Sequence, residues 1–138
     1  MDLGMLYSFM ARQRYAVVSS VSGEGIPQSA LMGIAVTPEL EIVFDTVKTS
    51  RKYPNLVERA KCSVVVGWEG QQTVQFEGVA VELRGEALQR YQGIYFAVWP
   101  EGRERLRWPA IAYFVVRARW IRYSDYERKP PLVAEISL

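Results

Sequence analysis

One short segment of the sequence combines cationic and hydroxyl side chains in a way that suits phosphate binding. Thr46, Ser50, Arg51 and Lys52 lie where a predicted strand ends and a predicted helix over residues 51–60 begins. An arginine fork and a compact lysine charge both bind phosphoryl oxygens well. On spacing alone a second interpretation stays open, in which Ser50 is an ordinary helix N-cap and the two cations are solvated.

The absence of histidine restricts the chemistry that the rest of the chain can perform. The sequence has no histidine and a single cysteine, Cys62, which we interpret as a small core residue. Ser-His-Asp and Cys-His nucleophile systems, HExxH zinc sites and histidine-ligated iron cannot be assembled from such a chain. We therefore expect no metal site, and redox chemistry would have to come from a bound cofactor.

Length and composition predict one globular domain. The chain has 138 residues, of which 49% are hydrophobic and 23% are charged. We expect residues 14–126 to form the core of a single domain over 1–138, and residues 127–138 to form a tail in which Pro130 and Pro131 break any regular element. The single cysteine, the absence of a signal peptide and the short apolar runs predict a cytoplasmic protein that does not cross a membrane.

Hydrophobic periodicity predicts a mainly β fold with flanking helices. Strands are expected over residues 14–22, 27–37, 40–46, 61–68, 72–83 and 110–123, the fourth of them buried on both faces. Helices are expected over 2–13, 51–60 and 85–98, and residues 101–108 are expected to be irregular. The apolar side chains of 72–83 change parity at Gly78, which predicts a β-bulge or a sharp bend there. This order of elements favours an antiparallel barrel over a doubly wound parallel sheet.

Several segments together resemble the pyridoxamine 5′-phosphate oxidase-like family of FMN-binding split barrels. They are residues 40–46, 50–52, 55–56, 62–66, 75–80 and 113–126, the last of which resembles the smaller general stress protein branch. The match runs from about residue 14 to residue 126, and Ser-Arg-Lys at 50–52 is its most specific part. The resemblance implies a six-stranded antiparallel split β-barrel that is homodimeric, with FMN at the subunit interface.

The resemblance also implies which residues contact the flavin. Arg51 and Lys52 would hold its phosphate, with Ser50 and Thr46 donating hydrogen bonds nearby. The second strand would lie along the ring and the ribityl chain. The implied set is completed by Ser29, Ala30, Leu31, Met32, Asp45 and Thr73. Three of these depart from the family pattern, since the oxidases carry arginine at the position of Ser29, tyrosine at Asp45 and glutamine at Thr73.

The implied function is that of an FMN-dependent oxidoreductase acting on a small molecule that the sequence does not identify. The oxidases end in a segment with arginine and histidine that holds the substrate's phosphate, and residues 128–138 lack that motif. We therefore do not expect oxidation of pyridoxamine phosphate. An F420-dependent reductase, a haem binder and a non-catalytic flavin-holding stress or sensor module remain open. Nucleic-acid binding is disfavoured, because acidic residues are interleaved with the basic ones.

Overall fold

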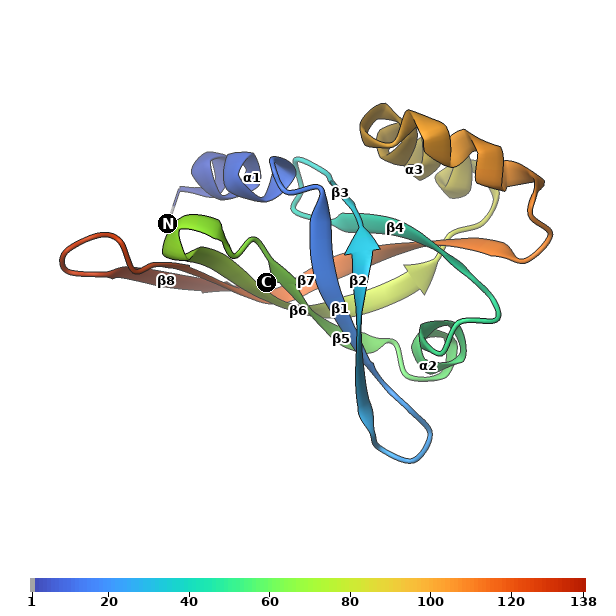
Figure 1. Ribbon diagram of the computed structural model, residues 1–138, viewed down its shortest axis with the longest axis horizontal. Coiled ribbons are helices and arrows are strands. Elements are labelled where there is room, and N and C mark those ends of the chain that lie inside the picture. Colours follow the sequence, from blue (N-terminus) through green and yellow to red (C-terminus); the bar gives the residue numbers. More distant parts are fainter. Residues whose placement is uncertain (1) are drawn as a thin grey trace.

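The computed structural model describes residues 2–138 as a curled antiparallel sheet with flanking helices (Figure 1). This confirms the predicted mainly β class with flanking helices. The helices are α1 (Leu3–Ala11), α2 (Lys52–Glu58), α3 (Gly85–Val98) and the 3-10 segments η1 (Glu69–Gln71) and η2 (Pro100–Arg107). The strands are β1 (Tyr15–Val21), β2 (Pro27–Gly33), β3 (Ala35–Val36), β4 (Ile42–Val47), β5 (Lys61–Val66), β6 (Gln72–Glu82), β7 (Ile111–Asp125) and β8 (Leu132–Ser137).

The strands follow the order β2-β1-β5-β6-β7-β4-β3, and β8 pairs with β7 beyond the end of β4. Residues 2–138 thus form eight strands, where the sequence predicted six. One of the additional strands comes from the predicted strand 27–37, which divides at Ile34. The division has a simple cause: β2 pairs with β1, whereas β3 has crossed to pair with β4.

The second additional strand lies in the C-terminal tail, where the prediction of an irregular segment was wrong. Strand β8 pairs with residues 120–125 of β7 and extends to one side of the molecule (Figure 1). Pro130 and Pro131 precede the strand, so their missing N–H groups remove no hydrogen bond from the ladder. Leu132 and Ile136 then pack against the main core.

Two hydrophobic clusters lie on opposite faces of the sheet. Inside the curl, α1 packs onto a core that includes Phe44, Phe76 and Phe114. On the outer face, α3 covers a second cluster that includes Val43 of β4 and Tyr113 and Val115 of β7. Strand β4 is therefore buried on both of its faces.

The prediction that strand 61–68 is buried on both faces was wrong. In β5 the side chains alternate, so that Cys62, Val64 and Val66 are buried while Ser63 and Val65 face outward. Val65 is 40% exposed. The outer cluster beneath α3 does not extend to β5, so this part of the sheet has no cover among the described residues. A second difference concerns residues 101–108, predicted to be irregular, most of which belong to η2.

The predicted irregularity at Gly78 is confirmed. The register between β6 and β7 shifts between Glu77 and Gly78. Glu77 lies opposite Trp120 and Gly78 lies opposite Ala118, so the extra residue is Arg119 of β7. The bulge therefore lies where the sequence placed it, although the partner strand carries the additional residue.

We expect Gly78→Ala to lower the free energy of unfolding by about 1–3 kcal/mol, because a Cβ there overpacks the bulge. It would lie 2.5 Å from the Arg117 carbonyl oxygen and 2.9 Å from the Phe76 ring. Gly93→Ala is the matched control. Its Cβ meets nothing within 4 Å, and alanine in a helix interior should stabilise by roughly 0.5–1 kcal/mol. Urea denaturation measures both, and equal effects would contradict the close approach at Gly78.

Candidate functional site

A small cavity is formed by α2, its N-terminal approach and strands β1 and β2. It has a volume of about 200 Å³ and is lined by Val18, Ser20, Gln28, Ser29, Ala30, Arg51 and Lys52. Four residues that the family resemblance assigned to a cofactor are thus brought together here, namely Ser29, Ala30, Arg51 and Lys52. The cavity is smaller than the roughly 300–1,000 Å³ that encloses a typical small ligand. It has room for a phosphate and the atoms next to it rather than for a whole dinucleotide-like molecule.

The turn between β4 and α2 places two further predicted residues beside the cations. The Thr46 and Ser50 hydroxyl oxygens lie 3.0 Å apart, and Lys52 Nζ donates to Thr46 Oγ1 at 3.3 Å. The interpretation of Ser50 as the helix N-cap was wrong. Helix α2 begins at Lys52, the preceding Arg51 already has helical backbone angles, and no side chain caps the helix. Ser50 instead stiffens the turn through Thr46.

Positive charge at this cavity has no counter-charge within the described residues. Arg51 is exposed and Lys52 is half-buried, and neither forms an ion pair in that part of the chain. The lining contains no carboxylate. Burial lowers the pKa of Lys52 below its ordinary value of 10.5. An anion in the cavity would compensate for that loss of hydration.

Asn55 ties α2 to the two strands that line the cavity. Its side chain is buried, and its amide nitrogen donates to Ser20 Oγ at 3.0 Å and to Gln28 Oε1 at 2.9 Å. Val18, Ser20 and Gln28 also line the cavity, although the sequence did not predict them as site residues. The alternation of buried residues along β1 could have indicated Val18 and Ser20, whereas no local pattern distinguishes Gln28.

Asp45 lies away from the cavity, on the face of β4 opposite to Thr46. Its carboxylate accepts from Arg105 Nε at 2.7 Å and from the Tyr95 hydroxyl at 3.3 Å. Burial, followed by the charge of Asp45, raises the pKa of Tyr95. The three side chains therefore fasten η2 and α3 to the outer face of the sheet.

The remaining predicted residues are also dispersed. Leu31 faces outward and is 62% exposed, whereas Met32 packs against the inner core. Thr73 lines a different cavity on the outer face of β6, together with Gln75 and Trp120. Within a single chain the structure does not bring these three residues to the cations.

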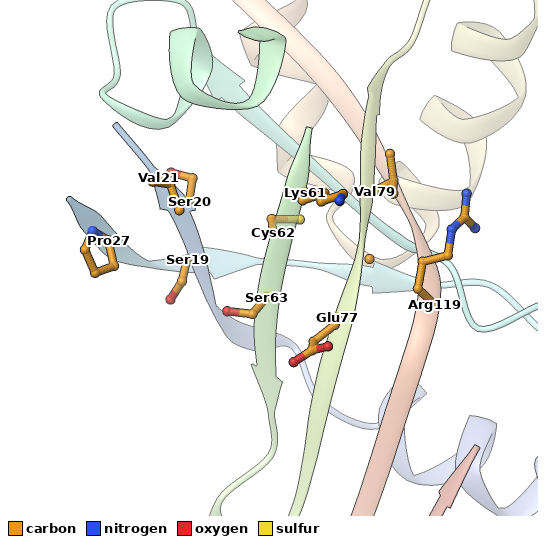
Figure 2. A pocket seen from close by; sticks show the side chains of 11 residues that line it. Ser19, Ser20, Val21, Pro27, Lys61, Cys62, Ser63, Glu77, Val79 and Arg119 are labelled. Atoms are coloured by element: carbon orange, nitrogen blue, oxygen red, sulfur yellow. The ribbon is translucent and has the colours of Figure 1, made fainter. Parts of the chain in front are cut away.

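The outer face of the sheet is hollowed over β1, β2, β5, β6 and β7 (Figure 2). A hollow of about 590 Å³ includes Lys61, Glu77 and Arg119, and it shares Ser63 and Glu77 with the hollow of about 460 Å³ that contains Thr73. We call the two together the outer trough. Ser20 lines both the outer trough and the small cavity, so the two sites are adjacent.

Other side chains with metal-binding or nucleophilic potential are not gathered into a site. Residues 2–138 contain no group of three or more His, Cys, Asp or Glu placed to hold a metal ion. Cys62 belongs to the inner core, as predicted, and burial raises the pKa of its thiol to about 11. No helix in the same residues is both long and apolar enough to span a membrane.

Comparison with known proteins agrees with this arrangement. The family profile described as pyridoxamine 5′-phosphate oxidase matches residues 6–126. The chain belongs to the pyridoxamine 5′-phosphate oxidase family. The predicted split-barrel fold is shared with solved structures of this family, although the curated proteins include no significant match.

Three solved structures show how widely the fold is used. A haem-binding protein from Mycobacterium smegmatis has a TM-score of 0.83 and 14% sequence identity. The alignment covers 99% of this chain and 58% of the length of the haem-binding protein. General Stress Protein 26 from Bacillus anthracis has a TM-score of 0.71 and 19% sequence identity, and the alignment covers 99% of this chain and 100% of that protein. A pyridoxamine 5′-phosphate oxidase-related, FMN-binding protein from Nostoc punctiforme has a TM-score of 0.68 and 12% sequence identity, and the alignment covers 91% of this chain and 86% of that protein. At these identities the likeness establishes the fold alone.

We expect Asp45→Asn to destabilise this oxidase-family chain without weakening a ligand of the cavity. Loss of the charged hydrogen bond to Arg105 should lower the free energy of unfolding by about 1.5–3 kcal/mol. The control Glu39→Gln breaks an exposed pair to Arg90 at 3.5 Å and should change stability by less than about 0.5 kcal/mol. Thermal or urea unfolding gives the stability. A variant that kept its stability and lost flavin would place Asp45 in the cofactor site instead.

Proposed function

We propose that the chain binds the phosphate of FMN in the small cavity and acts, as a homodimer, as an FMN-dependent oxidoreductase. The observation that carries this proposal is the pair Arg51 and Lys52, which line a cavity without any carboxylate partner among the described residues. Family membership supports the choice of flavin, since a relative with this fold is described as FMN-binding. A single free cysteine, Cys62, supports a reducing, cytoplasmic setting.

The residues present fit a flavin phosphate. Arg51 offers a bidentate donor, Lys52 a point charge, and the linked hydroxyls of Thr46 and Ser50 lie beside the lysine. Ala30 keeps the wall of the cavity open on the side of β2. Because the cavity is too small for the ring system, the ring would extend beyond it along β2.

When bound, FMN would supply hydride or electron transfer at its own ring. The described residues would hold and orient it, as no nucleophile or metal site is assembled beside the cavity in residues 2–138. The phosphate of F420 could use the same cations, and a haem binder shares the fold. The visible spectrum of the purified protein separates these three cofactors. Turnover of an electron acceptor with NADH or NADPH then separates an enzyme from a flavin-holding module.

The outer trough supports the homodimer. It exposes Val65 between polar side chains, and it carries Glu77 close to the cations Lys61 and Arg119. None of these three charges is paired within the described part of the chain. A two-fold interface repeats every contact, so Glu77 of each copy can meet a cation of the other. Through Ser20, such a partner would border the flavin cavity.

Arg51→Ala should weaken FMN binding by roughly ten- to a hundred-fold, because a charged hydrogen bond contributes about 1.5–3 kcal/mol. Riboflavin, which lacks the phosphate, should bind equally well to the variant and to the wild type. Titration of the apo-protein, followed by flavin fluorescence, measures both affinities. The control Arg90→Ala removes an exposed arginine on α3 that does not line the cavity, and it should change neither affinity. Unchanged FMN affinity in Arg51→Ala would remove the proposed anchor.

The affinity for FMN should fall at alkaline pH. Lys52 binds phosphate only while protonated, and burial lowers its pKa below 10.5, so the fall should begin below the pH at which an exposed lysine titrates. The phosphate itself stays dianionic there, since its second pKa is about 6. Lys52→Arg should abolish this alkaline loss, because a guanidinium stays protonated throughout that pH range. The same loss in both proteins would exclude Lys52 as its origin.

Glu77→Lys should dissociate the homodimer by placing like charges across the two-fold axis. Adding Lys61→Glu in the same chain should restore the dimer, because the charges are then merely exchanged. Sedimentation velocity gives the assembly state. Glu86→Lys, at an exposed position of α3, is the control for the change of charge alone. A wild-type chain that stays monomeric at micromolar concentration would contradict the proposed interface.

A further inference from the structure

The hydrogen bonds of Asn55 determine which polar atoms face the small cavity. An amide nitrogen has two hydrogens, and Asn55 uses one toward Ser20 Oγ at 3.0 Å and the other toward Gln28 Oε1 at 2.9 Å. Both recipients line the cavity, while Asn55 itself is 5% exposed. The side-chain oxygens of these two lining residues are thus engaged by a buried donor.

The hydrogen atoms of Gln28 and Ser20 that Asn55 does not engage are available to donate hydrogen bonds. Once Gln28 Oε1 accepts from Asn55, its amide nitrogen still carries two hydrogens, and no partner for them lies among the described residues. Ser20 is 2% exposed, and its hydroxyl hydrogen is likewise left over, because its oxygen accepts from Asn55. These N–H and O–H groups line the same cavity as the cations of Arg51 and Lys52. In the part of the chain that the structure describes, the Tyr113 hydroxyl is the only buried side-chain polar atom without a hydrogen-bond partner. The Gln28 amide hydrogens are therefore accessible to a ligand in the cavity rather than buried without an acceptor.

We propose that Asn55 is a positioning residue that turns Ser20 and Gln28 into hydrogen-bond donors, and that Gln28 binds a phosphoryl oxygen directly. The cavity then selects a phosphoryl group by two independent features, its positive charge and the donor groups that Ser20 and Gln28 present to it. Applied to the flavin, this inference rests on the proposed function. Selection of inorganic phosphate does not, because it requires the cavity alone.

The variant that tests the direction of these bonds is Asn55→Asp. A carboxylate of nearly the same shape only accepts, so Ser20 and Gln28 would have to donate to it and would present acceptors to the cavity. We expect FMN affinity to fall by at least about tenfold, with riboflavin affinity changed less than about twofold. Gln28→Met keeps the length of the side chain and removes its donor, and it should lower only FMN affinity, by several-fold. Gln89→Glu, at an exposed position of α3, is the control for added negative charge.

Inorganic phosphate is the second probe. Its stabilisation of the apo-protein against heat should be present in the wild type and in Gln89→Glu, reduced in Gln28→Met and lost in Asn55→Asp. Equal losses of FMN and riboflavin in Gln28→Met would indicate a packing role and overturn the inference. So would a wild type that phosphate does not stabilise, even if FMN binds through its ring. Phosphate selection without FMN binding would instead uphold this inference and refute the proposed function. If Asn55→Asp does not fold, Gln28→Met decides.

Discussion

Two positive charges held at the edge of the sheet without a counter-charge are the constraint around which this molecule is arranged. The chain is not short of acids, since it has 15 against 17 basic residues. Several of its acidic side chains pair with other arginines, for example Asp45 with Arg105 and Glu41 with Arg117. Withdrawing Lys52 from water lowers its pKa and is unfavourable for the empty protein. Such an arrangement is typical of a site that a ligand completes.

The topology leaves room for those charges. In the strand order β2-β1-β5-β6-β7-β4-β3, the first and last strands have no backbone pairing with each other in the part of the chain that the structure describes. The chain leaves β4 at Val47 and returns to β5 through α2, which lies against β1. Asn55 then joins α2 to β1 and β2 through side chains alone. On this side of the sheet, α2 is therefore joined to β1 and β2 by side-chain hydrogen bonds, and the small cavity lies beside them.

Features that depend on neighbours in the sequence were predictable, and features that depend on distant partners were not. The bulge at Gly78 and the cations 51 and 52 follow from local parity and composition. Strand parity also explains why Asp45 and Thr46 cannot share a site, since successive side chains point to opposite faces. By contrast, β8 forms only because β7 offers it a free edge, and the outer face of β5 is bare only because α3 covers other strands. The hydrogen bond between Asn55 and Gln28 joins residues far apart in the sequence, so no local pattern predicts it.

A cavity that holds only part of its ligand links cofactor binding to assembly. The small cavity accommodates a phosphate, so most of a flavin would lie on surface outside it. That surface is bordered by β2, whose Leu31 is exposed, and by the outer trough, which meets the cavity at Ser20. Under the proposed function, a second copy in the trough would form the remaining wall of the flavin site. The phosphate end would then be fixed by one chain and its Asn55 network, while the ring environment, and hence the chemistry, would depend on both.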